Sequence, residues 1–476
     1  MGPPSVNLVA WTRNPNGSQP PKPNTPRHDS FFKSVQWSAD GTTLFTLSHT
    51  NRVCAFVLPE NLLEPRPSPI ELTAQSTIAL PEPTTTVAPC PYFALENPAT
   101  QVFLSGCTDH PIQLHHFFPP SSSSSESQPT TTTYPPLATF RLIKKETEAY
   151  LRIASLIWPR PGTHFIAGTE NKIALFDVSR PDTGLSTEPL LAIPTIPSTR
   201  HISKGGGVGM RGTVSALSIS PQSMYSSYDG FGGGAAGVGG GLLAAGTWTR
   251  SLGLYDLFRS ASTSACVATW SVAPAASEAG IGGNGVMQLA WSPCGRYLLV
   301  NERNATGLLV YDVRSTRRLL AVLKGWDGRT NQRLACDVFP GTERVGGFEV
   351  WAGTVDGEVV VYEGVGNAEG SVEPSWKWKV GGGEAAVGGV GMHLSGSVVA
   401  TCSGSWKFRH EEDDSSSEDE ESSSDESGSG SESSSSSRRR RKEEQVYVEE
   451  TSLKVWSLGP AGPPSPSAEE YHEERN

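Results

Sequence analysis

The chain has 476 residues with 50 glycines, 37 prolines and only 18% charged residues, a composition typical of a turn-rich β protein with loose insertions. The net charge of −11 is local: eleven of the 49 acidic residues lie in Glu411–Ser437, and the remaining 38 balance the 38 Lys and Arg. Seven single cysteines without a C-x-x-C motif argue against a disulfide scaffold or a zinc site. No apolar run approaches the ~18 residues of a membrane span, and no secretory signal opens the chain.

One pattern recurs along the chain: a short apolar strand, a turn, a second strand ending in small residues, a polar turn, and a third strand ending in an aromatic-acid pair. Clear copies read ASLIWPRPGTHFIAGTENKIALFDV and MQLAWSPCGRYLLVNERNATGLLVYDV. The positions that match the Asp of a Trp-Asp dipeptide are Val57, His116, Asp177, Asp256, Asp312, Glu363 and Ser457. Their spacings exceed the ~40–45 residues of a compact WD40 repeat, so the blades carry insertions. Seven copies predict an all-β, seven-bladed WD40 β-propeller with disordered insertions.

The domain boundaries follow from the repeats and from composition. Residues 1–30 form an N-terminal segment whose strand-like run, Ser5–Trp11, is expected to complete the last blade and close the ring. The propeller is predicted over 31–458, and a disordered tail over 459–476. Low-complexity insertions are expected at 119–136, 222–241 and 409–445.

Strand order predicts which residues share one face of the disc. Each blade is an antiparallel meander of strands a, b, c and d, so the residue before strand a and the b–c turn lie at the same end. Nine positions there hold eight cations and one asparagine: Lys33, Arg52, Arg152, Lys172, Arg211, Arg250, Asn284, Arg303 and Arg333. Either polar turns simply carry Lys and Arg, or this face binds an anionic partner. At the same level, Phe31 and Trp248 are candidates for stacking on unpaired bases.

The acidic, serine-rich tract Glu411–Ser437 lies between strands b and c of the last blade, so it is expected to emerge on the same face. It is either an inert solvated loop or an internal competitor that shields the basic face from non-specific nucleic acid. The run that follows it, Arg438–Lys442, has the composition of a nuclear import signal.

Motifs of catalysis are lacking in the sequence. The string GVGMRG (Gly207–Gly212) fits G-x-G-x-x-G but precedes a strand instead of opening a helix. No G-x-S-x-G, H-E-x-x-H or Walker loop is found. We therefore predict a protein that is not an enzyme, with no catalytic residues, cofactor or metal site, and a structural role for His115 and His116.

Three strings, FFKSVQWSADG, AAGTWTRSLGLYD and TNQRLACDVFPG, are more specific than generic WD40 repeats. Through them the chain resembles the telomerase Cajal body protein family of WD40 propellers, including its fungal splicing-associated relatives, from about Trp11 to Leu458. The resemblance implies a nuclear scaffold that binds small nuclear or Cajal-body-type RNA, telomerase RNA among them. Such a scaffold supports RNP assembly, RNA localisation or pre-mRNA splicing. Phe31 and Arg333 stand at matching positions.

The expected partners are small nuclear RNA and RNP proteins, with a monomeric propeller inside larger complexes and no membrane. The alternative is a protein-docking propeller, such as a ubiquitin-ligase substrate receptor or a histone-binding adaptor; the cationic face favours nucleic acid over an apolar hot spot. The predicted RNA-binding residues are Phe31, Lys33, Arg52, Arg152, Lys172, Arg211, Arg250, Arg303 and Arg333.

Overall fold

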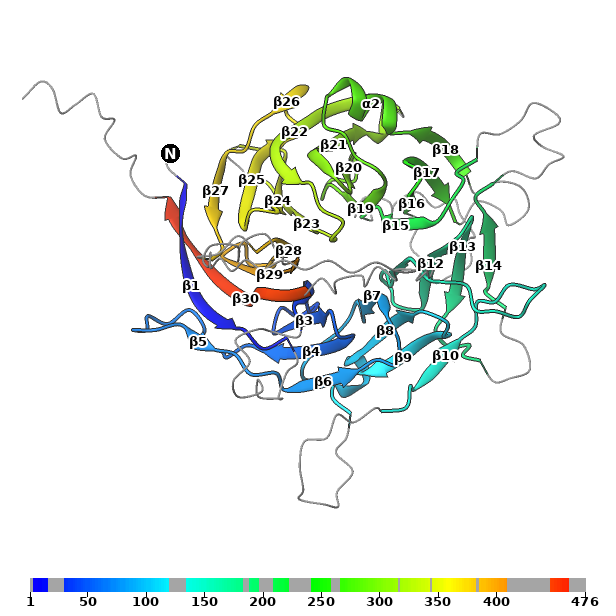
Figure 1. Ribbon diagram of the computed structural model, residues 1–476, viewed down its shortest axis with the longest axis horizontal. Helices are drawn as coiled ribbons and strands as arrows, with labels where there is room; N and C mark the ends of the chain where they lie inside the picture. The colour runs from blue at the N-terminus through cyan, green and yellow to red at the C-terminus, as the bar shows by residue number, and fades with distance from the viewer. Residues whose placement is uncertain are drawn as a thin grey trace, which may run out of the picture.

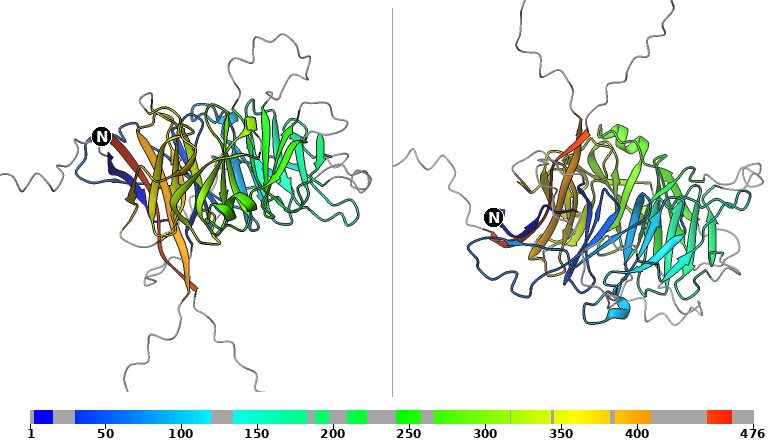
Figure 2. Two further views of the ribbon diagram at one scale, coloured as in Figure 1. Left: turned by 90° about the horizontal axis from the view of Figure 1, so that it is seen from above. Right: turned by 60° about the horizontal axis from the view of Figure 1, so that its bottom comes forward.

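The structure is a computed structural model that describes residues 3–15, 30–119, 134–182, 188–196, 209–221, 241–257, 266–315, 317–342, 345–381, 385–408 and 446–461. The Ser/Thr-rich stretch, most of the Gly-rich loop, the acidic tract and Arg438–Lys442 lie outside these residues. Seven separate sheets surround one central axis, which confirms the predicted all-β, seven-bladed propeller (Figure 1). Seen from the side, the blades form a thick disc (Figure 2).

The first four blades each contain four strands in the order a to d. Blade 1 is β2 (Phe32–Trp37), β3 (Thr43–Ser48), β4 (Arg52–Val57) and β6 (Ser76–Ala79). Blade 2 is β7 (Thr84–Pro89), β8 (Val102–Cys107), β9 (Ile112–His116) and β10 (Ala138–Phe140). Blade 3 is β11 (Ser155–Ile157), β12 (His164–Thr169), β13 (Lys172–Asp177) and β14 (Leu191–Pro194). Blade 4 is β15 (Val214–Ile219), β16 (Leu242–Thr247), β17 (Ser251–Asp256) and β18 (Cys266–Ser271).

Two of the last three blades gain a fifth, parallel strand at the outer edge. Blade 5 is β19 (Val286–Trp291), β20 (Tyr297–Glu302), β21 (Ala305–Asp312), β22 (Leu319–Gly328) and β26 (Gly370–Val372). Blade 6 is β23 (Cys336–Pro340), β24 (Phe348–Gly353), β25 (Glu358–Val365) and β27 (Trp376–Lys379). Blade 7 is β28 (Val387–Met392), β29 (Val398–Phe408), β30 (Val446–Ala461), β1 (Pro4–Thr12) and β5 (Ile70–Glu71). The described helical turns are η1 (Pro98–Thr100), α2 (Ala273–Glu278) and η3 (Val313–Ser315).

The two ends of the described chain close the ring. Strand β1 pairs antiparallel with β30, with Val6 opposite Leu458 and Thr12 opposite Leu453. β1 thus occupies the position expected for Ser5–Trp11. The pairing continues to Pro4 opposite Ala461, so the strand runs past the predicted end of the propeller at residue 458. Strand β1 lies on the outer side of β30, and the two-residue strand β5 pairs with β1 in turn, so the last blade contains strands from both ends of the described chain.

The small residues that end strand b have a packing reason. Gly168 in β12 lies directly against strand a of the next blade, and a Cβ there would stand 2.7 Å from the carbonyl oxygen of Val214. A larger side chain would therefore push neighbouring blades apart. The hydrophobic cores lie between the blades and within them, and one such cluster joins Phe45, Phe103 and Phe117.

His115 has the structural role that the sequence predicts. Its side chain is 5% exposed, and its ring stacks on Phe103 with the centroids 5.3 Å apart. Burial lowers the pKa of His115 to about 4. Among the described residues no group of three or more His, Cys, Asp or Glu side chains is placed to hold a metal ion. In the same residues no helix is long and apolar enough to span a membrane.

This buried imidazole predicts a loss of stability in acid. Between pH 6.5 and about 4 the unfolded chain takes up a proton that the folded protein does not accept, so the folded state loses stability as the pH falls. At about 1.4 kcal/mol per pKa unit, the loss amounts to about 3 kcal/mol. Denaturant unfolding at pH 7 and pH 4 measures it, with His115→Phe as the comparison. The acid-induced loss should be smaller in His115→Phe by about that amount, and an identical loss in both proteins would contradict the assignment.

Candidate functional site at the mouth of the central channel

The first strands of all seven blades line a central channel of about 690 Å³. Four of the predicted RNA-binding residues line it, namely Lys33, Arg152, Arg303 and Arg333, and Trp248 lies beside them. Asp337 is the acidic side chain among the described residues that line the channel. The channel therefore carries an excess of positive charge.

Backbone hydrogen bonds place the b–c turns beside the segments that precede strand a. In blade 1, His49 N–H donates to the carbonyl of Phe31 at 2.9 Å. In blade 5, Asn284 N–H donates to the carbonyl of Arg303 at 2.9 Å. Between blades 3 and 4, Asn171 N–H donates to the carbonyl of Gly212 at 3.0 Å. The two sets of turn residues thus share one end of the disc, called here the b–c face. The hairpin β29–β30 projects from the disc, and the undescribed residues 409–445 connect its two strands (Figure 2).

Trp248 is an exposed aromatic side chain between two guanidinium groups. It lies in the b–c turn of blade 4 and is 42% exposed. The guanidinium carbon of Arg152, from blade 3, is 5.8 Å from the ring centroid, and that of Arg303, from blade 5, is 5.9 Å away. Arg303 is further held by its Nε–H, which donates to Asn284 Oδ1 at 3.2 Å. We call Trp248, Arg152 and Arg303 the Trp248 platform.

Lys33 and Arg333 lie inside the channel. Lys33 is the second residue of β2, and its Nζ donates to the carbonyl of Thr84 at 3.1 Å. Arg333 precedes β23, and its Nη2 donates to the carbonyls of Ser215 at 3.1 Å and Met287 at 3.0 Å. Burial lowers the pKa of Lys33, and the nearby charge of Arg333 lowers it further. Arg333 is exposed to the open space of the channel. The protein atoms around its guanidinium still displace part of its hydration, and this lowers the pKa of Arg333.

Arg250 has a partner that the sequence did not reveal. Its Nε and Nη2 donate to the two carboxylate oxygens of Glu302 at 2.9 and 2.7 Å, and Nη2 also donates to the carbonyl of Gly282 at 2.7 Å. Glu302 is only 2% exposed. Burial raises the pKa of Glu302, while the hydrogen bond and charge of Arg250 oppose that shift. The predicted role of Arg250 as an RNA contact is therefore not supported, because its guanidinium neutralises a buried carboxylate of the next blade.

Phe31 is not available for base stacking either. It is 4% exposed, its ring stacks on His49 at 5.1 Å between centroids, and Trp406 meets it edge-on at 5.8 Å. The sequence places Phe31 at the level of the cations as a candidate for base stacking, whereas in the structure it packs beneath the projecting hairpin. The rim residues Arg52, Lys172 and Arg211 do not line the channel, and in the described chain no carboxylate forms an ion pair with any of the three.

The TNQR string fastens several blades to one another. Asn304 of blade 5 donates to Asn331 Oδ1 at 3.2 Å, and Gln332 Nε2 donates to the carbonyl of Gly404 in blade 7 at 2.7 Å. Arg333 reaches blades 4 and 5. Sequence reasoning missed Gln332 and Asn331, since their partners lie 72 and 27 residues away in the chain.

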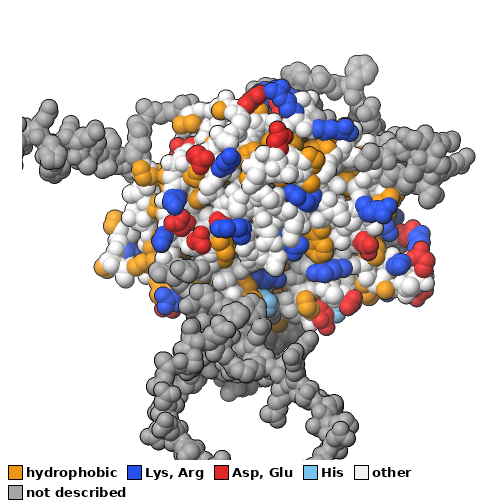
Figure 3. All heavy atoms as spheres, turned by 45° about the horizontal axis from the view of Figure 1, so that its top comes forward, with side chains coloured by type: hydrophobic (Ala, Val, Ile, Leu, Met, Phe, Trp, Pro, Cys, Tyr) orange, Lys and Arg blue, Asp and Glu red, His pale blue; other side chains and the backbone are white. Residues whose placement is uncertain are grey.

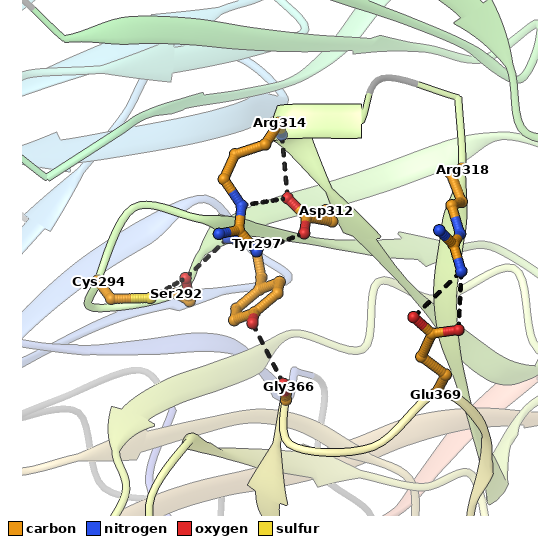
Figure 4. A network of polar contacts seen from close by, with 8 residues as sticks. All are labelled: Ser292, Cys294, Tyr297, Asp312, Arg314, Arg318, Gly366 and Glu369. Atoms are coloured by element: carbon orange, nitrogen blue, oxygen red, sulfur yellow. Dashed lines mark hydrogen bonds and ion pairs between the residues drawn. The ribbon is translucent and has the colours of Figure 1, made fainter.

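Two cations at the opposite end of blade 5 form ion pairs with carboxylates. Arg314 pairs with Asp312 at 2.7 Å, and Arg318 pairs with Glu369 at 2.9 Å (Figure 4). Tyr297 OH donates to the carbonyl of Gly366 in the same region at 3.2 Å (Figure 4). Elsewhere on the surface, Lys and Arg are mixed with Asp and Glu (Figure 3). Among the described residues none of the four cations that line the channel forms an ion pair, so the channel mouth differs from this mixed surface.

Fold and site together define a scaffold-like protein, a seven-bladed WD40-type propeller with a cationic channel mouth. No family model matches the sequence. The chain is similar to the Guanine nucleotide-binding protein negative regulator 1 of Schizosaccharomyces pombe, with 24% identity over 337 residues that cover 69% of this chain and 70% of the relative. This similarity does not confirm the resemblance to the telomerase Cajal body family.

Proposed function

We propose that the protein is a non-enzymatic nuclear scaffold whose b–c face binds single-stranded segments of a small nuclear or Cajal-body-type RNA. The observation that carries the proposal is the Trp248 platform, an exposed indole with a guanidinium from each neighbouring blade. Unpaired bases stack on such rings, and the flanking cations meet the phosphates of the same strand. The resemblance of FFKSVQWSADG and TNQRLACDVFPG to the telomerase Cajal body family supports the same function.

In this role the protein supports RNP assembly, RNA localisation or pre-mRNA splicing, with RNP proteins as partners. The nuclear location rests on the basic run Arg438–Lys442. A propeller whose relative carries the name of a regulator fits a scaffold better than an enzyme. Fluorescence microscopy of the tagged full chain, with and without Arg438–Lys442, tests the nuclear location.

A second candidate function is protein docking in the regulation of G-protein signalling. The observation that favours it is the similarity to a negative regulator of guanine nucleotide-binding proteins. An apolar hot spot would be expected for a stable protein complex, whereas the channel mouth presents cations that form no ion pair with the residues that the structure describes. Two results together would favour this alternative. The purified chain would bind a G-protein subunit equally well with and without Trp248→Ala, and it would not bind RNA.

The RNA proposal predicts a large effect of Trp248→Ala. Stacking of one base is worth about 1–3 kcal/mol, so affinity for a 5′-hydroxyl oligouridylate should fall about fivefold or more. Fluorescence anisotropy at constant salt measures it. Tyr92→Ala is the matched control, because Tyr92 is 47% exposed and has Arg160 5.4 Å from its ring centroid, but it follows strand a of blade 2 at the other end of the disc. Equal losses in the two variants would refute the Trp248 platform as the RNA site.

A further inference from the structure

Two cations in the channel have no counter-ion within the part of the chain that the structure describes. Lys33 extends from blade 1 and Arg333 from the segment before blade 6, and both side chains line the channel. Among the described residues neither forms an ion pair with a carboxylate. Their positive charges repel each other, and an anion that contacts both would offset this repulsion.

Asp337 does not supply that anion. Its carboxylate oxygens accept N–H groups of Val338 at 2.8 Å and Met392 at 2.7 Å, so it is directed at β23 and β28. Burial raises the pKa of Asp337, and the hydrogen bonds from Met392 and Val338 oppose that shift. Among the described residues Asp337 forms no ion pair with Lys33 or Arg333. The acidic residue of the channel is thus separate from the two cations.

Both cations are fixed in position and keep donors to spare. Lys33 uses Nζ for the carbonyl of Thr84, and Arg333 uses Nη2 for the carbonyls of Ser215 and Met287. An ammonium carries three N–H groups and a guanidinium five, so each side chain retains unused donors within the described structure. Two charged side chains with unused donors on the wall of one channel suit a tetrahedral oxyanion, which has several acceptor oxygens.

We propose that Lys33 and Arg333 form a binding site for a phosphate group that enters the channel from the b–c face. The channel volume of about 690 Å³ accommodates a small polyphosphate or the end of an RNA strand. Arg152 and Arg303 at the mouth attract the same anion. The phosphate belongs either to a free polyphosphate or to a terminal nucleotide, and the chemistry at the site is the same.

Calorimetric titration of the full chain with tripolyphosphate at fixed ionic strength tests the proposal. We expect one tripolyphosphate per chain and an affinity at least about tenfold weaker in Lys33→Gln. Glutamine removes the charge and keeps an N–H donor on a slightly shorter side chain, which makes it the mildest neutral replacement. Lys172→Gln is the matched control, because Lys172 opens strand c of blade 3 on the same face but does not line the channel. Equal affinities in wild type and Lys33→Gln, or no saturable binding at one per chain, would overturn the proposal.

A second variant tests the proposal even if the Lys33→Gln protein does not fold. Arg152 is exposed, so Arg152→Gln should fold, and it should weaken tripolyphosphate binding about threefold relative to Lys172→Gln by removing charge from the mouth. If Arg152→Gln and Lys172→Gln bind tripolyphosphate equally, the channel is not the anion site.

Two RNA probes identify the source of the phosphate. If the site takes a terminal phosphate, 5′-phosphorylated pentauridylate should bind about tenfold more tightly than the 5′-hydroxyl form, and Lys33→Gln should abolish the difference. Equal binding of both RNAs, with tripolyphosphate binding retained, assigns the site to a free polyphosphate. Trp248→Ala should weaken binding of the 5′-hydroxyl RNA and leave binding of tripolyphosphate unchanged. The RNA function and the phosphate site are therefore tested by different ligands, and either one can fail without the other.

Discussion

Replacing Arg250 by methionine is expected to lower the free energy of unfolding by about 3–5 kcal/mol, since it leaves Glu302 charged and buried without a partner. The pair joins blade 4 to blade 5 through two hydrogen bonds, and Arg250 also holds the carbonyl of Gly282. Thermal and denaturant unfolding of the purified variant measure the loss. The Arg250→Met/Glu302→Met double variant should recover most of it, because an apolar pair of similar volume removes the unpaired charge.

Arg314→Met is the matched control for this prediction. Arg314 also pairs with a carboxylate, that of Asp312 at 2.7 Å, but its side chain is 59% exposed (Figure 4). An exposed ion pair contributes at most about 1 kcal/mol. If Arg250→Met and Arg314→Met lose similar amounts of stability, burial does not make the Arg250–Glu302 pair more stabilising than an exposed ion pair.

Arg333→Ala is expected to reduce stability by at least about 3 kcal/mol, because it removes two hydrogen bonds from a charged donor, each worth about 1.5–3 kcal/mol. Those bonds connect the segment before blade 6 to blades 4 and 5 across the channel. The same substitution should weaken selective RNA binding more than Lys172→Ala does, since Lys172 offers only a point charge at the rim. Unfolding curves and RNA titrations of both variants measure these effects.

The stability measurement decides how the RNA result is interpreted. A large fall in melting temperature in Arg333→Ala means that its loss of RNA binding includes a loss of ring structure. Unchanged stability would contradict the cross-blade role of Arg333 and leave recognition as the reason for its position in the TNQR string. Arg303→Gln provides an independent comparison, because Arg303 lies at the channel mouth and is held by a single bond to Asn284.

The fold follows from the sequence because blade strands are local. The aromatic-acid end of strand c recurs in four copies, at Asp177, Asp256, Asp312 and Glu363, and small residues such as Gly168 end strand b in several. The remaining copies keep the strand spacing, so seven blades can be counted. Strand order also predicts that Lys33, Arg152, Arg303 and Arg333 stand near one another, and the channel contains all four. These inferences need only the direction in which each strand runs.

The rest of the site depends on contacts between distant residues. The sequence predicts that Arg250 lies on the b–c face, but the carboxylate it neutralises is 52 residues away in the next blade. Phe31 precedes a strand and was expected to be exposed, yet Trp406 from the last blade covers it. The Trp248 platform can be recognised only in the structure, where Arg152 and Arg303 from the two neighbouring blades lie beside the indole ring. Pattern and spacing along one chain do not contain these pairings.

The salt dependence of RNA binding tests the central claim most directly. The full-length chain is titrated with a 5′-hydroxyl single-stranded RNA by fluorescence anisotropy at salt concentrations from about 50 to about 200 mM. If the four channel cations Lys33, Arg152, Arg303 and Arg333 meet phosphates, log affinity should fall with log salt with a slope of about −3, from a coefficient near −0.7 per contact for single strands. A flat response, or no saturable binding at the lowest salt, would contradict the account of the b–c face as an RNA-binding surface.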